Sequence, residues 1–133
     1  MPSANPRILL ALASVLQLLG GLAHASAFPR ASAALATTNL TPFFSASFKA
    51  LWLADSTTML ALATVLGALA IRPGCATRPI VLLLSLIPFA VARLIYTFLG
   101  GFFAGHLLLT NAVIVFAAGL RFPKSSIRSD HSG

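Results

Sequence analysis

The sequence predicts an all-α integral membrane protein, a single domain over residues 1–133 built as a bundle of four transmembrane helices. Of its 133 residues, 58% are hydrophobic and only 8% are charged, whereas about 25% of a soluble domain is charged. A water-soluble fold of this composition would expose large apolar patches and aggregate. Four nearly continuous apolar runs, each close to the roughly 20 residues that cross a bilayer as a helix, complete the prediction.

The four apolar runs define the spans, and a basic tail at 121–133 follows the last of them. None shows the alternation of apolar and polar residues that is typical of a lipid-facing barrel strand. Gly100-Gly101 makes the last two runs an antiparallel hairpin, or one long run broken at the glycines. The only long connection, 28–49, is expected to lie along the membrane surface with Trp52 near the interface. The predicted spans are residues 8–27, 50–71, 80–99 and 102–120.

The first span has a second interpretation. A short basic start, an apolar core and Ala25-Ser26-Ala27 resemble a cleavable signal peptide, whose removal would leave three transmembrane helices. Against cleavage, one helix face carries a stripe of small and polar side chains, which favours a retained helix that packs against the other helices. The residues of this stripe are Ser14, Gln17, Gly20, Gly21 and His24.

Basic residues dominate the charge, with nine Lys and Arg against two acidic residues. They are scattered singly between apolar runs, without the basic helix face or aromatic-interleaved patch that would bind nucleic acid. Outside the four spans, one side of the membrane receives only Arg30 and Lys49. The other side, which holds both termini, is therefore expected to be cytoplasmic. Its six basic residues are Arg7, Arg72, Arg78, Arg121, Lys124 and Arg128.

Ionisable side chains within the spans are costly and so form the candidate site. With a rise of about 1.5 Å per residue, the ionisable groups of all four spans fall within about 10 Å of the same membrane face. Asp55 and Arg93, the only opposite charges in the spans, are expected to pair directly or through one water. The candidate ligand site or polar cluster consists of His24, Asp55, Arg93, Tyr96 and His106.

Three interpretations of this cluster stay open. Asp55 and Arg93 neutralise each other and fix the helix register, or Arg93 extends to the interface on its long side chain, or the group lines a functional pocket. Asn111, near mid-membrane, is expected to make an interhelical hydrogen bond. Small-residue pairs at Ala63 and Gly67, and at Gly101 and Gly105, indicate close helix contact or a homodimer.

The sequence contains no motif that names a reaction. It has no Gly-rich phosphate loop, no HExxH and no GxSxG, so no catalytic residue is predicted and enzymatic activity is not expected. Cys75 is the only cysteine and the three histidines are dispersed, whereas a structural zinc site needs four ligands. No metal and no cofactor are predicted.

Two short segments carry a resemblance to a known family. Gly21-Leu22-Ala23-His24 in the first span and Trp52-Leu53-Ala54-Asp55-Ser56 in the second resemble small bacterial four-helix membrane proteins of the broad DoxX-like kind. The resemblance implies a bacterial inner membrane protein, and it weakly implies quinone-linked redox chemistry or a role in oxidative stress. It supplies no catalytic motif.

Two functional hypotheses follow. The first is a non-enzymatic bundle that acts as an accessory or interaction subunit, with the lipid bilayer and another membrane protein or a second copy as partners. The alternative is a binding or redox-linked protein that holds a small apolar ligand, a quinone or lipid, at the polar cluster in the outer half of the bilayer.

The charge asymmetry generates a test of topology. A reporter enzyme fused after Gly133 should be active in the cytoplasm, because six basic residues against two place both termini there. Activity on the opposite side of the membrane would contradict this orientation.

Overall fold

The structure, a computed structural model, describes residues 5–123, and the regular elements of this part of the chain are all helices, without a strand. Four helical stretches, 6–36, 42–71, 78–99 and 103–121, are long and apolar enough to cross a membrane. The all-α four-helix prediction is therefore confirmed. The elements are α1 (Pro6–Ser26), α2 (Phe28–Ala36), α3 (Pro42–Ile71), the short 3-10 helix η1 (Pro73–Cys75), α4 (Arg78–Leu99) and α5 (Phe103–Arg121).

Local sequence signals set the helix ends. The side chain of Asn5 accepts a hydrogen bond from the backbone N–H of Arg7 at 3.0 Å, and Thr41 caps α3 through Phe44 at 3.5 Å. Both α1 and α3 begin with proline, which suits the first turn because its missing N–H has no helical partner there. Gly100 ends α4 with a φ of 66°, a left-handed conformation that costs glycine little.

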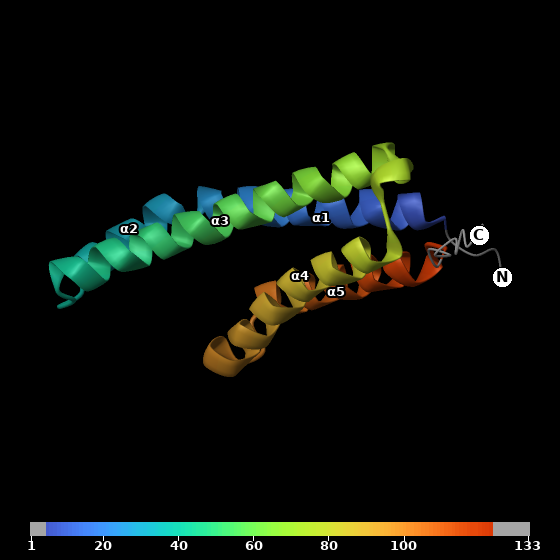
Figure 1. The fold of residues 1–133 in the computed structure, drawn as a ribbon. Helices are drawn as coiled ribbons and strands as arrows, with labels where there is room; N and C mark the ends of the chain where they lie inside the picture. The colour runs from blue at the N-terminus through green and yellow to red at the C-terminus, as the bar shows by residue number, and fades with distance from the viewer. Residues whose placement is uncertain (1–4, 124–133) are drawn as a thin grey trace, which may run out of the picture.

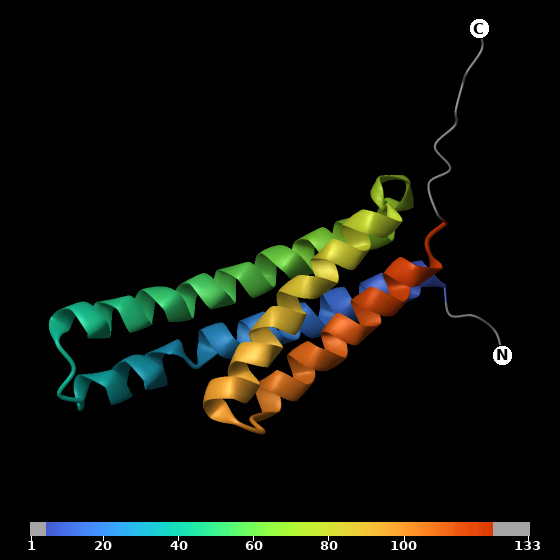
Figure 2. The same cartoon turned by 60° about the horizontal axis from the view of Figure 1, so that its bottom comes forward.

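The helices form two antiparallel hairpins (Figure 1). One consists of α1 and α2 packed against α3, and the other of α4 packed against α5; α1 also packs along α5 and thereby joins the two. The start of α1, the η1 connection and the end of α5 lie at one end of the bundle, here called the proximal end (Figures 1 and 2). The hairpins diverge toward the opposite, distal end.

The apolar core is concentrated where the hairpins meet near the proximal end. Leu10 on α1, Leu66 on α3 and Val115 on α5 are fully buried in one cluster. Burying a side chain of this size typically stabilises a fold by about 1.5–3 kcal/mol in water, whereas in a bilayer close packing replaces that driving force. Small residues, which allow close packing, are therefore more important for stability at the helix contacts in a bilayer than they are in water.

The predicted stripe on the first helix lies against its neighbours. The Ser14 hydroxyl donates to the carbonyl oxygen of Ala63 at 2.7 Å, and a Cβ added to Gly67 would lie 3.0 Å from the Ser14 oxygen. A Cβ on Gly21 would similarly lie 3.1 Å from Met59. The small pair Ala63 and Gly67 therefore serves contact within the chain, and removal of α1 would separate the two hairpins.

The segment 28–49 differs from the expected connection, because most of it is helical. α2 follows α1 after a break at Ala27, and α3 begins at Pro42 rather than at residue 50. Alanine-rich sequence favours helix, and the cap at Thr41 starts α3 eight residues earlier than the apolar run alone indicates. The non-helical part of this connection is reduced to residues 37–41.

A glycine pair gives a test of the packing. A Cβ on Gly119 would lie 2.8 Å from a Leu82 methyl carbon and 3.2 Å from the Leu82 backbone nitrogen, whereas a Cβ on Gly101 meets nothing within 4 Å. Gly119→Ala should therefore lower the free energy of unfolding in detergent by about 1–3 kcal/mol, a usual cost of overpacking. The matched control Gly101→Ala should change it little, and equal losses would contradict the α4–α5 contact.

Candidate functional site

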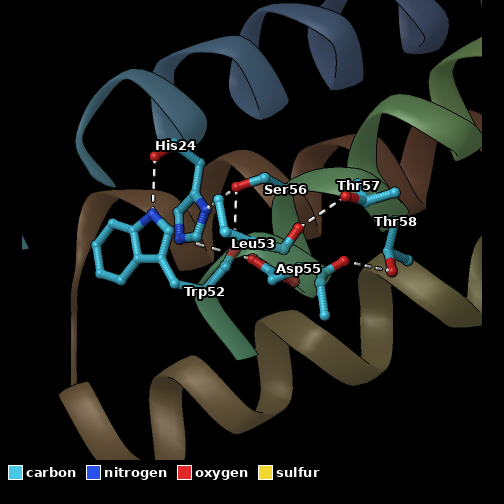
Figure 3. A network of polar contacts seen from close by, with 8 residues as sticks. His24, Trp52, Leu53, Asp55, Ser56, Thr57 and Thr58 are labelled. Carbon is cyan, nitrogen blue, oxygen red and sulfur yellow. Dashed lines mark hydrogen bonds and ion pairs between the residues drawn. The ribbon is translucent and has the colours of Figure 1, made fainter. Parts of the chain in front are cut away.

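The first polar group of the predicted site joins α1 to α3 near the distal side of the bundle (Figure 3). Trp52, Asp55 and Ser56 share one face of α3 because they are spaced i, i+3 and i+4. His24, in the last turn of α1, stacks on the Trp52 ring with centroids 4.3 Å apart and an angle of 13° between the planes. The indole N–H of Trp52 donates to the His24 carbonyl oxygen at 2.9 Å.

Hydrogen-bond directions define the role of the ring nitrogen Nδ1 of His24. The Ser56 hydroxyl donates its only proton to the Trp52 carbonyl oxygen at 3.0 Å, so it accepts from Nδ1 of His24 at 2.9 Å. Nε2 of the same ring lies 3.7 Å from a carboxylate oxygen of Asp55. The imidazole ring therefore has a carboxylate at its edge and an indole against its face.

A serine, a histidine and an aspartate in contact have the composition of a hydrolytic triad, but not its function. A nucleophilic serine must reach substrate, whereas Ser56 is only 3% exposed and its proton is committed to a backbone carbonyl. The contacts instead tie the end of α1 to the middle of α3. We therefore interpret this group as a helix lock.

The second polar group joins α4 to α5. The Tyr96 hydroxyl and Nδ1 of His106 are 2.7 Å apart, and the two rings meet edge to face with centroids separated by 5.3 Å. Gly105 makes room for this contact, since a Cβ there would lie 3.3 Å from the Tyr96 ring. The two helices of each hairpin are thus joined by a contact between one histidine and one hydroxyl.

The predicted five-residue site is consequently divided between the two hairpins. Within residues 5–123, the Asp55 carboxylate contacts the His24 ring, and no ion pair joins it to Arg93; the predicted direct Asp55–Arg93 pair is wrong. Similar depth did not imply contact, because α3 and α4 belong to different hairpins that diverge at this level (Figure 1). Arg93 is instead exposed on α4, the position expected of an arginine that extends toward an interface.

A buried amide pair lies deeper in the bundle, where the sequence predicted only that Asn111 would bond to another helix. Asn111 is fully buried, and its Nδ2 donates to the Gln17 side-chain oxygen and, at 3.2 Å, to the Ala13 carbonyl oxygen. These bonds join α5 to α1 and confirm that prediction. The Asn111 side-chain oxygen has no hydrogen-bond partner among the described residues, so close contact with α1 is obtained with one polar atom left unpaired.

An apolar groove of ≈ 320 Å³ lies between α4 and α5, away from both histidines. Its wall beside Pro88 includes Ser85, whose hydroxyl donates to the Leu82 carbonyl oxygen at 2.6 Å and therefore presents no free proton. The groove suits an acyl or isoprenoid chain and offers little polar recognition. Its lining residues are Ser85, Leu86, Phe89, Leu109, Ala112, Val113 and Phe116.

Sequence reasoning missed the stacking of His24 on Trp52 and the role of Ser56. The signal was present in the i, i+3, i+4 spacing of Trp52, Asp55 and Ser56, but the partner helix was not known.

In the described part of the chain, no group of three or more His, Cys, Asp or Glu side chains is placed to hold a metal ion. Comparisons with protein families, curated proteins and solved structures give no match to this chain.

The two competing ion pairs can be separated by double-mutant cycles. His24→Gln and Asp55→Asn should show a coupling of about 0.2–1 kcal/mol in unfolding free energy, the range of partly exposed pairs. The matched cycle of Arg93→Gln with Asp55→Asn should be additive within about 0.3–0.5 kcal/mol. Coupling to Arg93 without coupling to His24 would overturn the assignment.

Proposed function

We propose that this protein is a non-enzymatic accessory subunit of a membrane complex, and that it binds a transmembrane helix of its partner along α3. Four of the five side chains of the candidate site, all except Arg93, contact another polar side chain of the same hairpin. Their role in holding helices together favours an interaction protein over an enzyme.

The exposed face of α3 is the observation that carries this proposal. Its residues alternate at spacings of four and three, the register of a helix that packs along a left-handed partner helix. All are small and exposed, and small residues let helix backbones approach closely in a membrane. The stripe consists of Ala50, Ala54, Thr57, Ala61, Thr64 and Ala68.

The α3 stripe differs in side-chain composition from the exposed side of α4, and this difference supports a protein partner for the stripe. The hydroxyls of Thr57 and Thr64 donate to carbonyl oxygens four residues earlier in α3, at 2.8 and 2.9 Å, so neither presents an unbonded donor to the membrane. The exposed side of α4, by comparison, carries the large apolar residues that suit lipid chains: Leu83, Leu86, Ile87, Phe89, Leu94 and Phe98.

The proposed location is a bacterial inner membrane with the proximal end in the cytoplasm. The start of α1 and the end of α5 lie at this end (Figure 2), as an even number of spans requires. The basic residues of the proximal end, Arg7, Arg72, Arg78 and Arg121, outnumber the two of the opposite end, which favours this orientation.

The apolar groove between α4 and α5 favours a second candidate function, the binding of a small apolar ligand such as a quinone or lipid. In this alternative the ligand chain occupies the groove rather than the predicted polar cluster. Mass spectrometry of the purified protein separates the candidates, because a stoichiometric small molecule supports the second and a stoichiometric protein the first.

Matched tryptophan substitutions test the α3 face. Ala61→Trp should reduce co-purified partner, or dimer if the partner is a second copy, by about tenfold, because a bulky ring separates close-packed helices. The control Ala90→Trp lies at a similar depth on the exposed side of α4 and should have little effect. Disulfide crosslinking through Ala61→Cys, with the exposed Cys75 replaced by serine, should give a stronger product than Ala90→Cys. Equal behaviour of the two sites would contradict the proposal.

A further inference from the structure

One hairpin is much longer than the other. With a rise of about 1.5 Å per residue, the 30 residues of α3 span about 45 Å and the 19 residues of α5 about 29 Å. Both hairpins meet at the proximal end, so the tip of the α1–α3 hairpin projects beyond α4 and α5 (Figures 1 and 2). The projecting part, residues 28–49, is here called the distal tip.

The two lengths match two different thicknesses of a bilayer. The hydrocarbon core is about 30 Å thick, and the headgroup layers bring the total to about 40–45 Å. If α4 and α5 span the hydrocarbon core, the distal tip therefore extends through the headgroup layer on its side. Tilting by the usual 20° or so shortens a 45 Å helix by only a few ångströms, so it leaves the tip in that layer.

The distal tip carries two cations at a similar level. The antiparallel register that places His24 against Ser56 and Gly21 against Met59, when continued past the break at Ala27, puts Arg30 of α2 near the level of Lys49 of α3. Arg30 is exposed and Lys49 is partly exposed, and residues 28–49 contain no acidic residue. The pair of cations therefore has no counter-charge within the tip.

Exposed aromatic rings accompany the two cations. Phe43 is 73% exposed and Phe44 60%, and the Phe48 ring lies 5.8 Å from that of Trp52. Tryptophan is enriched where a bilayer meets water, and apolar rings beside basic residues are typical of segments that lie in the headgroup region. This combination distinguishes the tip from the α3 stripe, which is uncharged.

We infer that the distal tip is a phospholipid-binding element, in which Arg30 and Lys49 bind the phosphate of an anionic headgroup while the phenylalanine rings insert between acyl chains. An anionic lipid supplies the missing counter-charge, and its phosphates lie at the depth that the helix lengths give to the two cations. The inference stands apart from the partner proposed for α3, since neither cation belongs to the α3 stripe.

The single tryptophan of the chain gives a local readout, because Trp52 lies next to the tip. The full-length protein is reconstituted at low ionic strength in vesicles of phosphatidylcholine and phosphatidylglycerol, with bromine on the acyl chains of one lipid or the other. Quenching of Trp52 by the brominated anionic lipid should exceed that by the zwitterionic lipid. Two basic residues near the surface predict that the tip prefers the anionic lipid to the zwitterionic lipid by about thirtyfold.

The double variant Arg30→Gln/Lys49→Gln should bring this ratio close to one, and salt should weaken the wild-type preference. Arg72→Gln/Arg121→Gln removes the same charge from the proximal end and should leave the Trp52 ratio unchanged. Equal quenching by both lipids in the wild-type protein would overturn the inference and leave the cations to an acidic protein partner. A proximal-end variant that loses the preference equally would also overturn it, whatever the outcome of the α3 experiments.

Discussion

The buried contact between Gln17 and Asn111 is the constraint on which the arrangement of the two hairpins depends. The hairpins are otherwise joined by the short segment around η1 and by apolar packing, which is less directional than a hydrogen bond. In the bilayer core a polar side chain cannot form hydrogen bonds with water. The two amides therefore favour the placement of α5 on α1 that brings them into contact. Interhelical bonds of this kind contribute about 0.6 kcal/mol on average, and their larger effect is on specificity.

The fold was largely predictable because the membrane limits the alternatives. Long apolar runs can only be helices when they lack strand alternation. The short connection at 100–102 makes α4 and α5 antiparallel neighbours, whereas the connection at 72–77 reverses the chain direction without packing α3 against α4. The early start of α3 at Pro42 was not predicted, since hydropathy detects the apolar part of a helix and not the capped, alanine-rich extension before it. The resemblance to DoxX-like proteins stays a prediction.

The candidate site was predictable in its residues and not in its pairing. His24 and Asp55 were both identified as ionisable groups at similar depth, and they do meet. The error with Arg93 came from treating depth as the deciding coordinate, when the position of each helix around the bundle axis decides which side chains touch. Packing at Gly20, Gly21 and Gly105 sets this position around the bundle axis. From a single sequence these residues can be identified only as small, without their contacts. The contacts of His24 with Trp52 and Ser56 were not predicted for the same reason, because they depend on how α1 is rotated against α3.

The unequal lengths of α3 and α5 give the two hairpins a different reach across a bilayer. A helix that exceeds the local hydrocarbon thickness adapts by tilting or by deforming the lipid around it, at a cost of a fraction of a kcal/mol per ångström. Since α1 is bonded to α5, the longer hairpin cannot tilt freely without moving the shorter one. Lipids on the α3 side therefore meet a helix that continues through the headgroup layer, whereas lipids on the α5 side meet one whose length is close to the hydrocarbon thickness alone.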